Sequence, residues 1–223
     1  MQQPWWKKQL SYFVDIKIES VESRYSKLLE LIYSRGRYAL RTENAIYSFE
    51  DLYHNFRESF YQIHLDDFPI KNVLVLGLGL GSVPRMLERL FKKQYSYTCV
   101  DIDNEVIRLA KKYGLSDLDS PVNTVCADAY EFVKNAEIKY DLVVVDLFID
   151  DTVPSKFEKI EFLKNVEQLL TSNGILMYNR MSSTAESAQK TEDYYNSTFT
   201  KVFENAAFIV VRGNKILLNR HKD

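Results

Sequence analysis

Four consecutive apolar residues, Val73 to Leu76, run directly into a loop that carries glycine at positions 77, 79 and 81. Such a run predicts a strand buried on both faces, and apolar residues from Val83 to Phe91 follow at helical spacing. A glycine-rich turn between a buried strand and a helix lets a ligand approach the backbone closely, because no Cβ stands in the way. The stretch therefore predicts an α/β fold with a ligand at its first turn.

The alternation of short apolar runs with longer amphipathic ones continues to the end of the chain. Predicted strands at 97–101, 122–126, 142–146 and 174–178 are separated by predicted helices at 105–113, 130–135, 157–170 and 186–203. This order indicates a doubly wound, mostly parallel, Rossmann-like sheet with helices on both faces. The final segment has two strand-like runs around residues 212–215, which predicts an antiparallel hairpin that closes the sheet.

Before Pro69 the pattern is different. Short β segments flank a turn at residues 34–36, and a helix is expected to begin near Ser48 with Asp51 in its first turn. We therefore divide the chain into a small N-terminal region of β-hairpins and one helix, residues 1–68, and an α/β domain, residues 69–223.

Composition argues against several functions. The formal net charge is −2 and the basic residues are scattered among acids, so no nucleic-acid partner is expected. No apolar run approaches the ~18 residues that span a bilayer, so a cytoplasmic protein without a membrane partner is expected. Cys99 and Cys126 lie in apolar runs without metal-ligand spacing, so we interpret them as small hydrophobic residues and expect no metal site.

Acidic residues follow the predicted strands one after another: Asp101 and Asp103, then Asp128, then Asp146. The carboxyl ends of parallel strands form one edge of the sheet, where ligands bind, so these acids are expected to converge on one site. Each has a plainer explanation as a helix cap, Asp103 and Asp128 above all, although capping does not explain why every strand in turn ends in an acid. A cluster of carboxylates repels a pyrophosphate and attracts a sulfonium nucleoside and an amine.

The loop itself fits two ligand-binding patterns. G-x-G-x-x-G, the dinucleotide pattern, would place its third small residue at Ser82, whereas Gly77, Gly79 and Gly81 satisfy G-x-G-x-G as written. The second spacing is similar to the first motif of the S-adenosylmethionine-dependent methyltransferase fold. A tight connection without a ligand is the remaining alternative, and an NAD-dependent oxidoreductase is the least favoured class.

Longer stretches resemble the spermidine synthase family, the aminopropyltransferases of the methyltransferase fold. The family's glycine loop, its V-E-I-D-x-x-V-I and its G-D-A-x-E-F are similar to residues 77–82, 100–107 and 127–132. The resemblance implies that the nucleoside is bound by Gly77, Gly79, Gly81, Asp101, Asp103, Asp128 and Ala129, with Asp101 at the ribose and Asp128 at the adenine amino group. A Tyr-His pair in the family resembles Tyr53 and His54, which implies a catalytic Tyr53 and a substrate-binding His54.

The departures from the family pattern bear on chemistry. Leu80 stands where the family has the aspartate that holds the aminopropyl end, and Ile149 where it has a second acid after the fourth strand. Asp150 or Asp151 could substitute for that acid if the loop is longer. An apolar wall would disfavour a dication by about 2–5 kcal/mol, so putrescine is a doubtful substrate. Asp146 is the residue expected to carry chemistry, as a base or as an orienting group.

The sequence therefore predicts a nucleoside-binding, spermidine synthase-like transferase that uses S-adenosylmethionine or its decarboxylated form. Transfer of a methyl or related group to a small acceptor, such as an amine, is the main interpretation. Polyamine synthesis by aminopropyl transfer and an inactive binding paralogue are the alternatives. Members of the family commonly form dimers, so the resemblance implies a homodimer.

Overall fold

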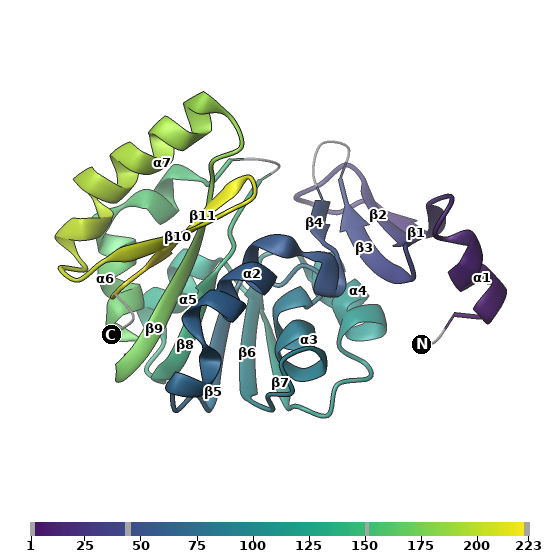
Figure 1. Cartoon of the computed structure of the whole chain (residues 1–223), viewed down its shortest axis with the longest axis horizontal. Coiled ribbons are helices and arrows are strands. Elements are labelled where there is room, and N and C mark those ends of the chain that lie inside the picture. Colours follow the sequence, from purple (N-terminus) through teal and green to yellow (C-terminus); the bar gives the residue numbers. More distant parts are fainter. Residues whose placement is uncertain (1–2, 43–45, 150–151, 221–223) are drawn as a thin grey trace.

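A computed structural model describes residues 3–42, 46–149 and 152–220 of the chain. Its centre is a seven-stranded sheet in the order β10-β11-β9-β8-β5-β6-β7, and a separate four-stranded antiparallel sheet has the order β1-β2-β3-β4 (Figure 1). The strands are β1 (Ile16–Val21), β2 (Leu29–Ser34), β3 (Arg37–Arg41), β4 (Ile46–Ser48), β5 (Asn72–Leu76), β6 (Ser96–Asp101), β7 (Val122–Cys126), β8 (Tyr140–Val145), β9 (Leu170–Met181), β10 (Ala207–Val211) and β11 (Asn214–Leu218).

Seven α-helices and several short helical turns connect the strands that the structure describes. The helices are α1 (Trp5–Leu10), α2 (His54–Ile63), α3 (Ser82–Arg89), α4 (Asn104–Leu109), α5 (Ala129–Asn135), α6 (Ile160–Gln168) and α7 (Ala185–Ser197). The turns are η1 (Glu50–Leu52), η2 (Leu65–Asp67), η3 (Ala110–Gly114, π-helical), η4 (Ser155–Glu158) and η5 (Phe199–Lys201). The predicted doubly wound, mostly parallel fold is confirmed.

The central strands are buried on both faces because helices cover both sides of the sheet. Val73 and Val75 of β5 point to one face, where Phe56 of α2 and Met86 of α3 pack on them. The alternate residues Leu74 and Leu76 point to the other face, where α5, α6 and α7 supply the apolar partners. This explains why the sequence of β5 is a continuous apolar run instead of alternating with polar residues.

β5 pairs in parallel with β6 and with β8, and β8 pairs in parallel with β9. The carboxyl ends of these strands therefore lie at one edge of the sheet. The expected hairpin is also present, since β10 and β11 are antiparallel and β11 joins the edge of β9. The turn of this hairpin consequently lies beside the end of β9.

The N-terminal sheet packs against the loop that follows β5. Leu31 and Leu40 of this sheet share an apolar cluster with Leu80 and with Leu109 of α4. The turn expected at residues 34–36 joins β2 to β3. The helix expected to begin near Ser48 begins instead at His54, after η1, because Glu50 has a left-handed backbone (φ 42°) that interrupts a helix.

Candidate functional site

A cavity of about 600 Å³ lies at the carboxyl ends of the parallel strands. Its walls come from the glycine loop, the segments that follow β6, β7 and β8, the end of β9, the segment before α2, and the start of β11. Its lining includes Tyr53, Gly77, Gly79, Asp101, Asp103, Asp128, Ala129, Asp146, Ile149, Lys156, Asn179 and Asn214. Four predicted acids from three successive strand ends therefore do meet in one cavity.

Two of the three loop glycines line this cavity, and their backbones explain why glycine is there. Gly77 has φ 92°, and a Cβ added to it would lie 2.1 Å from the carbonyl oxygen of Asp146. A Cβ added to Gly79 would lie 3.0 Å from the Cβ of Ser48. Gly81 does not line the cavity and instead occupies the N-cap position of α3. The loop thus allows the end of β5 to approach the end of β8.

The carboxylate of Asp101 holds the glycine loop in place. Its Oδ2 accepts the backbone N–H of Leu78 at 3.0 Å and its Oδ1 accepts that of Asp103 at 3.0 Å. Burial raises the pKa of the Asp101 carboxyl to about 6, although these backbone hydrogen bonds and one from Gly79 oppose the rise. Asp103 caps α4 by accepting the N–H of Glu105 at 2.9 Å, and its other oxygen accepts the hydroxyl of Ser23.

The two carboxylate oxygens of Asp128 likewise have different partners. One oxygen caps α5 by accepting the N–H of Tyr130 at 2.9 Å, and the other pairs with the ammonium of Lys156. Ala129, the first residue of α5, lines the cavity beside it. The capping explanation is therefore correct for Asp103 and Asp128, and both side chains line the cavity as well.

The carboxylate of Asp146 is hydrogen-bonded only by side chains among the contacts that the structure describes. The Tyr53 hydroxyl donates to Oδ2 at 2.9 Å and the Asn179 amide donates to Oδ1 at 2.9 Å. Burial raises the pKa of the Asp146 carboxyl to about 6, and these two hydrogen bonds limit the rise. Burial and the charge of Asp146 raise the pKa of Tyr53 well above its usual value, so the phenol remains a donor.

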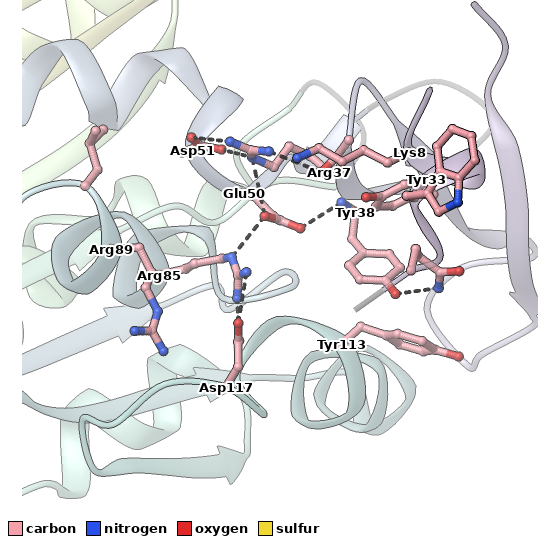
Figure 2. A pocket seen from close by; sticks show the side chains of 14 residues that line it. Lys8, Tyr33, Arg37, Tyr38, Glu50, Asp51, Arg85, Arg89, Tyr113 and Asp117 are labelled. Atoms are coloured by element: carbon pink, nitrogen blue, oxygen red, sulfur yellow. Dashed lines mark hydrogen bonds and ion pairs between the residues drawn. The ribbon is translucent and has the colours of Figure 1, made fainter. Parts of the chain in front are cut away.

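Tyr53 reaches Asp146 because hydrogen bonds hold the segment before it against α3 and against the N-terminal sheet. The Ser48 and Ser82 hydroxyls lie 2.6 Å apart, which joins β4 to the start of α3. The buried carboxylate of Glu50 accepts the Tyr38 N–H at 2.8 Å and the Arg85 guanidinium at 2.9 Å (Figure 2). Burial raises the pKa of the Glu50 carboxyl against these contacts.

Glu50 also lines a second cavity, of about 720 Å³, between the N-terminal region and α3 (Figure 2). Its acids face arginines: Arg37 pairs with Asp51, and Arg85 with Asp117 at 2.6 Å. None of the strand-end aspartates lines it. We therefore assign the candidate site to the first cavity and a structural role to this charge network.

Several predicted positions fall elsewhere. His54 is exposed on α2, with its ring nitrogen 2.7 Å from Arg57, and it does not line the cavity. Leu80 is 1% exposed and packs toward the N-terminal sheet, so it does not form the apolar wall expected of it. Ile149 does line the cavity. Asp150, expected to bind substrate, lies outside the described residues, as does Asp151.

Among the polar residues of the cavity that sequence reasoning missed are Asn55, Lys156, Asn179 and Asn214. Asn179 lies inside β9 and Asn214 begins β11, and no motif distinguishes an asparagine there from one that only faces solvent. Lys156 is the only cation in the described lining, against four aspartates, so the cavity is acidic. The part of the chain described contains no group of three or more His, Cys, Asp or Glu residues that could hold a metal ion. It also contains no helix with the length and apolar character that crossing a membrane requires.

Solved structures share this architecture. A probable spermidine synthase from Corynebacterium glutamicum superimposes with a TM-score of 0.73 at 20% identity, covering 90% of this chain and 78% of that one. A spermidine synthase in complex with the transition-state analogue AdoDATO gives 0.71 at 16% identity, covering 93% and 74%. The strand order and the antiparallel last strand define the class I methyltransferase-like fold.

Sequence comparison identifies the family within that class. The model of the spermine/spermidine synthase domain matches residues 58–212, and the chain belongs to this family. A polyamine aminopropyltransferase from Vibrio vulnificus is 30% identical over 155 residues, which are 67% of this chain and 50% of that protein. The chain thus spans about half the length of the curated relatives it matches.

Proposed function

We propose that the chain is an aminopropyltransferase, which transfers the aminopropyl group of decarboxylated S-adenosylmethionine to an amine. The observation that carries the proposal is Asp146, a carboxylate with side-chain donors on both oxygens, in an acidic cavity beside the glycine loop. The named activity of the relatives supports aminopropyl transfer over methyl transfer, the main interpretation of the sequence. The spermidine synthase solved in complex with the transition-state analogue AdoDATO supports a nucleoside donor of this type.

The charge of the cavity supports a decarboxylated donor. Its described lining has four aspartates and Lys156, which is already paired with Asp128. The carboxylate of intact S-adenosylmethionine would meet like charges there, whereas a bare aminopropyl ammonium would meet opposite ones. The same field attracts a protonated amine acceptor.

The proposed reaction is a displacement at the carbon next to the sulfonium. The lone pair of the acceptor nitrogen forms the new N–C bond, the C–S bond breaks, and its electron pair neutralises the sulfur to give methylthioadenosine. The acceptor nitrogen must be deprotonated, and Asp146, with a pKa of about 6, is suited to orient the amine and take its proton. We assign Tyr53 to holding that carboxylate, and Asp101 and Asp128 to the ribose and adenine.

The direct test incubates the protein with decarboxylated S-adenosylmethionine and a series of amines, and measures methylthioadenosine by chromatography. Intact S-adenosylmethionine with the same amines, read out as S-adenosylhomocysteine, tests methyl transfer in parallel. We expect product only from the decarboxylated donor. Methyl transfer alone, or no calorimetric binding of either nucleoside, would overturn the proposal.

The role of Asp146 is tested by Asp146→Asn. Loss of a general base lowers turnover by roughly 10²–10⁴-fold, while nucleoside affinity should change little. Asp141→Asn is the matched control, because Asp141 lies at the opposite end of β8 and accepts the N–H groups of Lys71 and Asn72. Equal turnover in the two variants would exclude Asp146 from the mechanism.

A further inference from the structure

A chain of amide hydrogen bonds leads from the C-terminal hairpin to Asp146. The side-chain NH₂ of Asn214, the first residue of β11, donates to the Asn179 carbonyl oxygen at 2.9 Å. The NH₂ of Asn179 in turn donates to Oδ1 of Asp146 at 2.9 Å. Asn179 is 1% exposed, so its buried amide depends on these two side chains for its hydrogen bonds.

The two ends of an asparagine amide have the same shape and opposite hydrogen-bonding roles. Only the NH₂ end of Asn179 can stabilise an ionised Asp146. That orientation leaves the carbonyl oxygen of Asn179 needing a donor, and the amide of Asn214 supplies it. If the Asn179 amide turned over, its oxygen would face the carboxylate and its NH₂ would face the NH₂ of Asn214.

We propose that Asn214 is a positioning residue of the site, which fixes the orientation of Asn179 and thereby keeps Asp146 ionised and aimed into the cavity. Among the described hydrogen bonds, Asn214 reaches Asp146 only through Asn179. The hairpin that closes the sheet is then part of the catalytic apparatus, and its role rests on the proposed function of Asp146.

Other titratable groups around the cavity do not supply this control. Tyr53, from the segment before α2, donates to the other oxygen of Asp146. The ionisable residues that line the rest of the cavity are Tyr25, Tyr47, Asp101, Asp103, Asp128 and Lys156. Apart from burial, the groups that shift the pKa of Asp146 are Asn179 and Tyr53, which both lower it, and Lys156 is paired with Asp128. Asn179 and Tyr53 are therefore the groups that hold Asp146 ionised, and Asn214 acts on the first of them.

The experiment measures the pKa of Asp146 by carbon NMR of protein labelled at the aspartate carboxyl groups, with Asp146→Asn to assign the signal. Asn179→Ala removes a hydrogen bond to a charged group and should raise this pKa by about 1–2 units. Asn214→Ala should raise it by about half as much. In the Asn179→Ala background, Asn214→Ala should have no further effect, because the two residues act in series.

Asn219→Ala is the matched control. Asn219 follows β11 at its far end, and its amide likewise ties the strand to β9, through the N–H of Leu176 and the carbonyl of Gly174. This variant should lose similar stability and leave the Asp146 pKa unchanged. If Asn214→Ala does not fold, Asn214→Leu keeps the size of the side chain, removes its donor and gives the same readout.

An unchanged Asp146 pKa in the Asn214 variants, an equal shift in Asn219→Ala, or an additive double variant would overturn the inference. The titration needs no substrate, so its result is separate from that of the transfer assay. A shifted pKa without any transfer activity would confirm the hydrogen-bond relay and refute the proposed reaction. Transfer activity whose pH–rate profile keeps the same acidic limb in Asn214→Ala would support the proposed reaction and refute the hydrogen-bond relay.

Discussion

A methyl group added at Gly77 should damage both the fold and the site, because Gly77 lies against the backbone that carries Asp146. In Gly77→Ala the new Cβ would lie 2.1 Å from the Asp146 carbonyl oxygen and 2.8 Å from its carbonyl carbon. These are backbone atoms of a central strand end, so they cannot rotate away as a side chain could. Either β5 and β8 separate at this edge or the loop leaves its left-handed conformation.

The loss of folding stability expected for Gly77→Ala has two parts. A left-handed backbone costs alanine about 1–2 kcal/mol, and overpacking at a rigid contact adds about 1–3 kcal/mol. Gly213→Ala isolates the first part: Gly213 has a similar φ of 78°, and an added Cβ would meet only the Cβ of Ser183, at 3.7 Å. We therefore expect a loss of about 2–5 kcal/mol for Gly77→Ala and about 1–2 kcal/mol for Gly213→Ala.

Urea unfolding followed by far-ultraviolet circular dichroism measures both free energies of unfolding. In the proposed aminopropyl transfer, the folded fraction of Gly77→Ala should also be about 100-fold slower, since a displacement of about 1 Å at a catalytic group has this effect. Equal stability of the two variants would refute the close approach of β5 to β8. Full activity in Gly77→Ala would show that the Asp146 backbone does not need this position.

Three further predictions test individual side chains. Tyr53→Phe removes a hydrogen bond to the Asp146 carboxylate, which is worth about 1.5–3 kcal/mol or 1–2 pKa units. The acidic limb of the pH–rate profile should therefore move to higher pH. An unchanged limb would show that Tyr53 does not control the ionisation of Asp146. Burial raises the folded-state pKa of Asp146 from 3.8 to about 6, so its contribution to stability is intact below pH 3.8 and lost as the pH rises through 6. The wild-type protein should therefore lose up to about 3 kcal/mol of its unfolding free energy between pH 4 and pH 7 through this group, and Asp146→Asn should not show this loss. Urea unfolding of both proteins at the two pH values measures it. A difference between wild type and variant that is the same at pH 4 and pH 7 would contradict the raised pKa. Leu80→Asp restores the acid of the family pattern but buries it in an apolar cluster, so urea unfolding should show a loss of about 3–5 kcal/mol; wild-type stability would mean that this side chain can turn into the cavity.

The sequence was sufficient to predict the parts of the fold that depend on local pattern. The run at Val73–Leu76 is apolar because helices cover both faces of β5, and the same reasoning located every strand of the large sheet. The strand-end acids could be predicted to converge because parallel strands bring their carboxyl ends to one edge. Neither conclusion requires a long-range contact to be known.

What the sequence could not predict depends on contacts between distant residues. Ser48 resembled a helix cap, but its hydroxyl is used by Ser82, 34 positions away, and the helix begins six residues later. The direction of Leu80 depends on the N-terminal sheet, whose packing is invisible in a loop motif. Asn179 and Asn214 lie close enough to form a hydrogen bond only because β11 is inserted beside β9.

The strand-end acids also show that an acid can cap a helix and line the cavity at the same time. A carboxylate has two oxygens, and in Asp103 and Asp128 one oxygen caps a helix while the other takes a side-chain partner. Asp101 uses both oxygens on the backbone, which makes it part of the loop. Asp146 alone among the four has only side-chain donors in the described hydrogen bonds, so its ionisation depends on residues that can be exchanged without altering a helix or a strand. In the proposed reaction, a group whose protonation can be adjusted in this way is the one suited to accept the proton of the amine.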